Sequence, residues 1–120
     1  MTIARILIVD DSDAVRSIVR GILVQAGYDV VEAMDRDSAL QMFSESRPDG
    51  LLLDIDMPGF SGIEVLRELR EIDPDVRVAM LTGMRTPETV AEAVHLHVRD
   101  YVAKPFTAQR LRDAVQRLLA

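Results

Sequence analysis

The sequence predicts an α/β fold in which a parallel sheet is covered by helices on both faces. Apolar runs without polar alternation, within residues 3–9 and at 51–53, indicate buried strands, and three further segments bring the predicted total to five short strands. They alternate strictly with five segments whose apolar residues recur at helical spacing. Such alternation indicates parallel strands joined by right-handed crossovers.

The length and composition indicate one cytoplasmic domain. A chain of 120 residues, 48% of them hydrophobic, can bury a core of its own. It has no cysteine, which excludes disulfides and thiolate metal sites, and no apolar run long enough to span a membrane. The net charge of −6 argues against direct binding to nucleic acid. We therefore expect residues 1–120 to form a single domain, without a membrane or nucleic-acid partner.

The first strand–helix unit extends to Gly27. A strand is predicted over residues 3–9, and two aspartates follow it directly. Ser12 or Asp13 can cap the next helix, which Gly27 ends. Helical spacing places the apolar face of this helix at Val15, Ile18, Val19, Ile22 and Leu23, with Arg16 and Arg20 facing outward.

The second and third strands follow the same pattern. A strand over residues 29–33 precedes a helix that Asp35 can cap and that extends to about Ser46. The third strand contains three consecutive leucines, residues 51–53, and its apolar run stops abruptly at Asp54. A carboxylate is therefore expected at the end of a buried strand, next to a tight loop.

The remaining elements are marked by their caps. Pro58 and Gly59 break the chain before a helix over residues 61–72, for which Ser61 and Glu64 predict a capping box. The last two strands are predicted at residues 76–81 and 99–103. The helix between them is capped by Thr86 with Pro87 at its first position, and the last helix is capped by Thr107.

Four of the five predicted strands end in polar residues suited to chemistry. These are Asp10-Asp11, Asp54, Thr82 and Lys104, the single lysine among 14 basic residues. Parallel strands bring these ends to one edge of the sheet, where open α/β folds bind ligands. Neighbouring carboxylates repel one another and tolerate proximity only beside cations. Lys104 and a divalent metal would supply that charge, and Mg²⁺ suits carboxylate, water and phosphate oxygens.

This set of residues suits transfer of a phosphoryl group to an aspartate. Such transfer needs mainly positioning and charge neutralisation, and Thr82 adds a hydroxyl donor. Asp54 is the expected acceptor, at a strand end that we expect to be accessible to solvent. Each residue also has an ordinary alternative role as a turn acid, a strand residue or a surface charge. Matched chemistry at four strand ends favours the functional interpretation.

Four segments of the chain match one family. They are Ile-Leu-Ile-Val-Asp-Asp at 6–11, Asp-Ile-Asp-Met-Pro-Gly-Phe-Ser-Gly at 54–62, Leu-Thr-Gly at 81–83 and Asp-Tyr-Val-Ala-Lys-Pro-Phe at 100–106. With them the chain resembles, from end to end, the receiver domains of two-component response regulators. The resemblance implies a flavodoxin-like, doubly wound (βα)5 fold with a five-stranded parallel sheet of order 2-1-3-4-5.

The resemblance also assigns roles to the strand-end residues. Asp54 would accept a phosphoryl group from a sensor histidine kinase or a phosphotransfer protein. Mg²⁺ would be bound directly by Asp11 and Asp54, mainly through water by Asp10, and by the backbone carbonyl of Asp56. Lys104 would pair with Asp54 or its phosphate.

A switch is implied beyond the phosphorylation site. Thr82 would hydrogen-bond the phosphoryl group and pull the loop at residues 83–85 inward, and Tyr101 would turn inward behind it. The fourth helix, fifth strand and fifth helix would then present a changed surface to a downstream target protein. The Lys104–Pro105 peptide resembles the cis bond of the family.

One departure from the family concerns the end of the fourth helix. The family often has Gly-Ala there, whereas this chain has His97 and Val98. If His97 must take the left-handed conformation, it is strained relative to glycine.

Two other functions compete with the switch. A hydrolase or phosphatase on the same fold could use Asp54 as nucleophile and Asp56 as acid, but 120 residues leave little room for a cap or a substrate pocket. A flavin or nucleotide binder is disfavoured, because the chain has neither a Walker-type loop nor a Gly-x-Gly-x-x-Gly turn. We expect a switch that is not an enzyme beyond its own phosphorylation and dephosphorylation.

Overall fold

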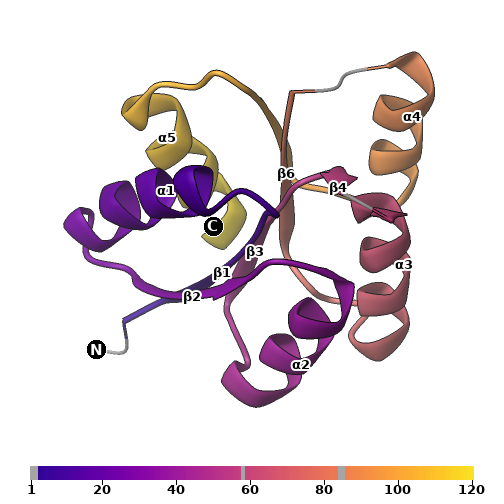
Figure 1. Cartoon of the computed structure of the whole chain (residues 1–120), viewed down its shortest axis with the longest axis horizontal. Coiled ribbons are helices and arrows are strands. Elements are labelled where there is room, and N and C mark those ends of the chain that lie inside the picture. Colours follow the sequence, from indigo (N-terminus) through magenta and orange to yellow (C-terminus); the bar gives the residue numbers. More distant parts are fainter. Residues whose placement is uncertain (1–2, 58, 84–85) are drawn as a thin grey trace.

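The protein is a five-stranded parallel sheet between two layers of helices (Figure 1). This computed structural model describes residues 3–57, 59–83 and 86–120. The strands of the main sheet are β1 (Arg5–Val9), β2 (Asp29–Ala33), β3 (Gly50–Leu53), β6 (Val78–Thr82) and β7 (Asp100–Ala103). The helices are α1 (Asp13–Gln25), α2 (Arg36–Ser46), α3 (Gly62–Ile72), α4 (Pro87–His95) and α5 (Ala108–Leu119).

The strand order places a ligand site at one edge of the sheet. The order is β2-β1-β3-β6-β7 and every pair is parallel. In chain order these five strands are 2-1-3-4-5, which confirms the predicted fold. The order reverses direction between β1 and β3, and open α/β sheets bind ligands at the carboxyl ends of strands beside such a reversal.

The two faces of the sheet carry separate apolar cores. Helices α1 and α5 cover one face, and α2, α3 and α4 cover the other (Figure 1). Along β1, Ile6 and Ile8 belong to the core under α1 and α5, while Leu7 and Val9 belong to the opposite core. Burial on both faces is thus confirmed for β1 and β3, whereas the edge strands β2 and β7 are only partly buried. Among the described residues, no helix has the length and apolar character needed to cross a membrane.

The predicted helix caps form in all five helices. The N-cap residues of α1 to α5 are, in turn, Ser12, Asp35, Ser61, Thr86 and Thr107. Reciprocal capping boxes join Asp35 to Ser38 and Thr86 to Thr89. At α3 the prediction is wrong in detail, because the Ser61 hydroxyl accepts the N–H of Ile63 rather than that of Glu64.

The segment after Asp54 contains a hairpin that the sequence did not predict. Strands β4 (Asp56–Met57) and β5 (Phe60–Ser61) pair antiparallel before α3 begins. Two-residue strands are too short to leave a periodic signal. Pro58, predicted to break the chain here, and residues 84–85, predicted to move with Thr82, lie outside the described residues. Strand β2 has the predicted bounds, and those of β1, β3, β6 and β7 differ from prediction by one or two residues.

The buried face of helix α1 is narrower than predicted. Ile18, expected to face the core, is 59% exposed. Arg16, expected to face outward, has a side chain that is only 12% exposed. Helical spacing locates a buried face to within about one residue, and a long arginine can extend beneath its own helix to polar partners.

The chain leaves α4 through a strained residue. His97 has φ of +61°, the left-handed conformation that the family resemblance indicated and that glycine adopts at least cost. Its N–H donates to the carbonyl of Val94 at 3.0 Å, as is usual beyond the end of a helix. The chain therefore makes the left-handed turn between α4 and β7 with a histidine in place of glycine.

Candidate functional site

The carboxyl edge of the sheet brings together the residues expected there. Asp10 and Asp54 follow β1 and β3, which pair directly, and their carboxylates and that of Asp11 have oxygens within 4.8 Å of one another. Thr82 ends β6, and Lys104 follows the neighbouring strand β7. The strand ends therefore converge as the parallel topology requires.

Lys104 supplies positive charge to this cluster. Its Nζ donates to Asp10 Oδ2 at 2.7 Å and lies 3.6 Å from Asp54 Oδ2. The expectation that Lys104 pairs with Asp54 is therefore incomplete, since its shorter contact is with Asp10. The Lys104–Pro105 peptide is cis, as the resemblance implied, and the backbone N–H of Lys104 donates to the Thr82 carbonyl at 2.9 Å.

Asp54 is almost completely buried. Its exposed fraction is 3%, so the expectation of a solvent-accessible strand end is wrong. Burial raises the pKa of the Asp54 carboxyl to about 6; the charge of Lys104 opposes this rise, and those of Asp10 and Asp11 add to it. One oxygen also accepts the N–H of Asp56 at 3.2 Å. A carboxylate in this setting is short of positive charge and is stabilised by any further cation.

The three aspartates fit a magnesium site in charge, chemistry and spacing. One ammonium faces three carboxylates, so a divalent cation would balance the two negative charges that remain. Carboxylate oxygens are the hard ligands that Mg²⁺ prefers. Asp10 is buried and already accepts from Lys104 and from the N–H of Ser12 at 2.9 Å, whereas Asp11 is exposed. Asp11 is therefore the more available of these two candidate ligands.

Gly62 supports the site, and the sequence patterns did not single it out. Its N–H donates to the Ile55 carbonyl at 2.7 Å, and a Cβ built on Gly62 would lie 2.0 Å from the backbone oxygen of Asp54. Only glycine allows α3 to start so close to the segment that carries Asp54. A signal was available, because glycine in a helix costs about 1 kcal/mol relative to alanine and so indicates a packing need.

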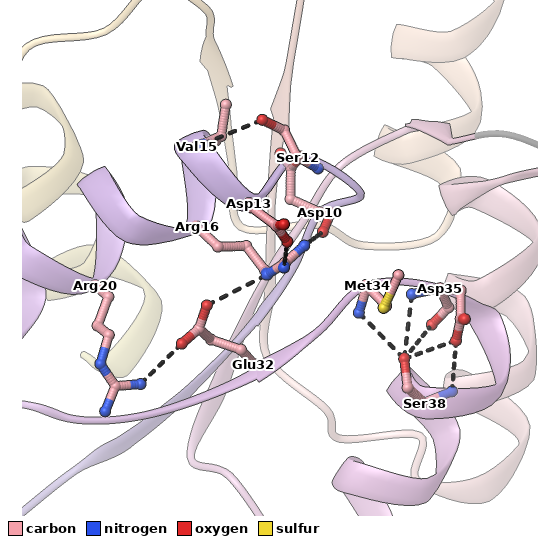
Figure 2. Close-up of polar contacts among 10 residues, drawn as sticks. All are labelled: Asp10, Ser12, Asp13, Val15, Arg16, Arg20, Glu32, Met34, Asp35 and Ser38. Carbon is pink, nitrogen blue, oxygen red and sulfur yellow. Dashed lines mark hydrogen bonds and ion pairs between the residues drawn. The ribbon is translucent and has the colours of Figure 1, made fainter.

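Arg16 is a second neighbour of the site that the sequence placed incorrectly. Figure 2 shows its guanidinium between the end of β1 and the strand β2. Nη1 donates to the backbone carbonyl of Asp10 at 2.6 Å, and Nε donates to Glu32 Oε1 at 3.2 Å. Asp13, in the first turn of α1, accepts from Nη2. The guanidinium therefore contacts the backbone from which the aspartate cluster extends.

The two residues expected to act as the switch lie on one face of the sheet. Tyr101 is half-buried and packs against the core under α3 and α4. It pairs with Met80 of β6, whose side chain belongs to the same core, and Thr82 lies two residues further along that strand. Residues two apart on a strand point to the same face, so Thr82 and Tyr101 are neighbours on adjacent strands.

Comparisons with known proteins agree with this geometry. The family model described as "Response regulator receiver domain" matches residues 6–116. The chemotaxis protein CheY of Bacillus subtilis (strain 168) is 37% identical over 116 residues, which make up 96% of this chain and 97% of that protein.

Solved structures give the same result. The chemotaxis protein CheY4 of Vibrio cholerae has a TM-score of 0.93 and 32% sequence identity, over 98% of this chain and 100% of that chain. The response regulator TrrA of Thermotoga maritima, solved in complex with Mg(2+)-BeF, has a TM-score of 0.88 and 32% identity over the same shares of the two chains. On the match over residues 6–116 and these likenesses, the chain belongs to the response regulator receiver domain family.

Proposed function

We propose that Asp54 is the residue through which this receiver domain is phosphorylated, by a sensor histidine kinase or a phosphotransfer protein. As a member of its family, the chain is a phosphorylatable signalling switch of two-component systems. The observation that carries the assignment is the buried carboxylate of Asp54, whose pKa burial raises to about 6 within a cluster of three aspartates and one lysine. Residues 1–120 would act together as one receiver domain in the cytoplasm.

The chemistry needs few groups. An Asp54 carboxylate oxygen attacks the phosphorus of a phosphohistidine; the P–O bond forms as the P–N bond breaks, and the imidazole nitrogen keeps the electron pair. Mg²⁺, held by the carboxylates of Asp10, Asp11 and Asp54 and the carbonyl of Asp56, would neutralise charge on the phosphoryl oxygens. The Lys104 ammonium, 3.6 Å from Asp54, would pair with the new phosphoryl group.

The switch would run through Thr82 and Tyr101. Thr82 is fully buried, and its hydroxyl would hydrogen-bond the phosphoryl group as the end of β6 shifts toward Asp54. That shift would free space on the face of the sheet where Tyr101 packs, and Tyr101 would turn into it. The surface of α4, β7 and α5 would then present a changed shape to a downstream target protein.

Family membership favours this switch over a phosphatase that uses Asp54 as nucleophile and Asp56 as acid. Receiver domains are signalling switches rather than conventional enzymes. We propose no catalysis beyond the domain's own phosphorylation and dephosphorylation. The two alternatives differ in stoichiometry. A switch accumulates at most one phosphoryl group per chain, whereas a phosphatase turns over substrate continuously.

Asp54→Asn tests the assignment directly. Incubation with Mg²⁺ and a small acyl phosphate, followed by intact-mass measurement, should give one phosphoryl adduct on the wild-type chain and none on the variant. Asp56→Asn is the matched control, since its exposed side chain is replaced while its backbone carbonyl remains, and it should keep the adduct. A full adduct on Asp54→Asn would exclude Asp54 as the acceptor. Continuous phosphate release without any adduct would favour the phosphatase.

A further inference from the structure

We propose that Arg16 is a positioning residue for the metal site, acting through the peptide that joins Asp10 to Asp11. This inference rests on the proposed function, because it assumes that these aspartates bind Mg²⁺. Arg16 contacts no carboxylate of the aspartate cluster. Its contact is with the backbone carbonyl of Asp10, as Figure 2 shows.

The contacts of Arg16 join three segments of the chain. Nη1 donates to the carbonyl at the end of β1, Nε to Glu32 on β2, and Nη2 to Asp13 in α1. The side chain is only 12% exposed. Arg20, one turn further along α1, also binds Glu32, at 2.9 Å, but its side chain is 50% exposed. Of these two arginines, Arg16 is the one that contacts the backbone of Asp10.

Fixing the Asp10 carbonyl also fixes Asp11. A peptide unit is planar, so the carbonyl oxygen of one residue and the N–Cα bond of the next move as one body. The Arg16 bond of 2.6 Å holds one side of this plane, and the bonds from Ser12 and Lys104 hold the Asp10 carboxylate. The direction in which Asp11 leaves the loop is thereby set. Asp11 is exposed and lacks the burial that restrains Asp10 and Asp54.

Because Arg16 is positively charged, the direction in which its replacement changes the Mg²⁺ affinity tests the inference. A guanidinium near the site repels a divalent cation, so its charge alone would weaken Mg²⁺ binding. Removing that charge would then strengthen binding, whereas losing a support for Asp11 would weaken it. Groups that orient metal ligands from outside the coordination sphere commonly change affinity by about 10- to 100-fold.

The experiment compares Arg16→Gln with Arg20→Gln by calorimetric titration of Mg²⁺ alone. Both variants remove one positive charge from α1 next to Glu32, but only the first removes the bond to the Asp10 carbonyl. We expect Arg16→Gln to weaken Mg²⁺ binding about tenfold, and Arg20→Gln to leave it unchanged or slightly tighter. Urea unfolding without Mg²⁺ separates this effect from a general loss of stability.

Phosphorylation by an acyl phosphate gives the second measurement. In Arg16→Gln the Mg²⁺ concentration for half-maximal rate should rise, while the rate at saturating Mg²⁺ stays close to wild type. Equal Mg²⁺ affinities in Arg16→Gln and Arg20→Gln, or a lower maximal rate at an unchanged half-maximal concentration, would overturn the inference.

Two further outcomes are decisive. If Arg16→Gln does not fold, Arg16→Lys decides, because lysine keeps the charge but lacks the fork that bridges two segments. Weaker Mg²⁺ binding by that variant supports the inference, and wild-type affinity overturns it. A wild-type chain that binds no Mg²⁺ and takes no phosphoryl group would instead refute the proposed function, which separates the two failures.

Discussion

Two shielded aspartates of this domain have opposite electrostatic surroundings. Asp54, at the carboxyl edge of the sheet, has one cation within 4 Å among the residues that the structure describes, and burial raises its pKa to about 6. Asp100, the first residue of β7, accepts two bonds of 2.9 Å from Arg110 and one of 3.1 Å from Arg117. The bonds from Arg110 hold the pKa of the Asp100 carboxyl below its usual value.

The difference is the one expected between a structural carboxylate and the phosphoryl acceptor that we propose. Asp100 is balanced by groups of the chain itself, and it ties β7 to α5. Asp54 is left short of positive charge, which destabilises the domain without metal but leaves the carboxylate able to gain stability from a bound metal ion. Perturbed titration of this kind is common at functional sites and is informative when the geometry agrees, as it does here.

The largest effect that follows from this comparison concerns Asp54 and pH. Without divalent cations, the folded protein keeps a proton that the unfolded chain loses as the pH rises through about 4 to 6, so the free energy of unfolding falls over that window. A pKa raised from 3.8 to about 6 corresponds to about 3 kcal/mol. Asp54→Asn should therefore exceed the wild type in stability by about that amount above pH 6.

Urea unfolding in the presence of a chelator, from acid to neutral pH, measures this difference. The two proteins should converge in acid, where the wild-type carboxyl is protonated in both states. Adding Mg²⁺ at neutral pH should narrow the gap, because a ligand of the folded state stabilises it. Equal stabilities at neutral pH without metal would show that the Asp54 charge is already compensated.

Asp100 should respond in the opposite direction. Asp100→Asn removes the negative charge that accepts three hydrogen bonds from the guanidinium groups of Arg110 and Arg117. We expect this variant to lower the free energy of unfolding by about 2 kcal/mol at neutral pH. Because the pKa of Asp100 is lowered by folding, its contribution is complete above the ordinary aspartate value near 3.9 and is lost as the pH falls below it. The gap between variant and wild type should therefore close in acid, as monitored by circular dichroism during urea unfolding. A gap that persists there would assign the effect to packing.

Much of the contrast between the surroundings of Asp54 and Asp100 could not be predicted from the sequence. Strand order, helix caps and the convergence of Asp10, Asp54 and Lys104 at one edge follow from apolar runs, cap residues and the family segments. These signals are local, or they depend only on the strands being parallel. They place each residue on an element but do not say which partner a long side chain chooses.

The wrong orientation predicted for Arg16 and the incomplete set of partners predicted for Lys104 have that origin. Arg16 turns inward because Glu32, on another strand, offers a carboxylate beneath α1, and no spacing within α1 encodes this. Lys104 could reach either of two aspartates, and the shorter contact with Asp10 depends on the detailed course of the loop after β7. Ile18 lies exposed because the buried stripe of α1 is narrower than its apolar pattern.

The smallest effect separates the two guanidinium partners of Asp100. The Arg117 side chain is 63% exposed and makes one contact, whereas that of Arg110 is 37% exposed and makes two contacts with the carboxylate. Exposed ion pairs contribute little, since water screens them and ordering a long side chain costs entropy. We expect Arg117→Gln to lower the free energy of unfolding by about 0.5 kcal/mol or less, and Arg110→Gln to lower it by about 1 to 2 kcal/mol.

Urea unfolding at low and high salt tests this ranking, because salt screens the exposed pair more than the shielded one. The Arg117→Gln effect should disappear in high salt, while most of the Arg110→Gln effect should remain. Equal losses in the two variants would mean that Asp100 needs both cations. One guanidinium would then not be enough to compensate the negative charge of a shielded carboxylate. The single lysine beside Asp54 would then compensate less of that carboxylate's charge than the contact distance alone indicates.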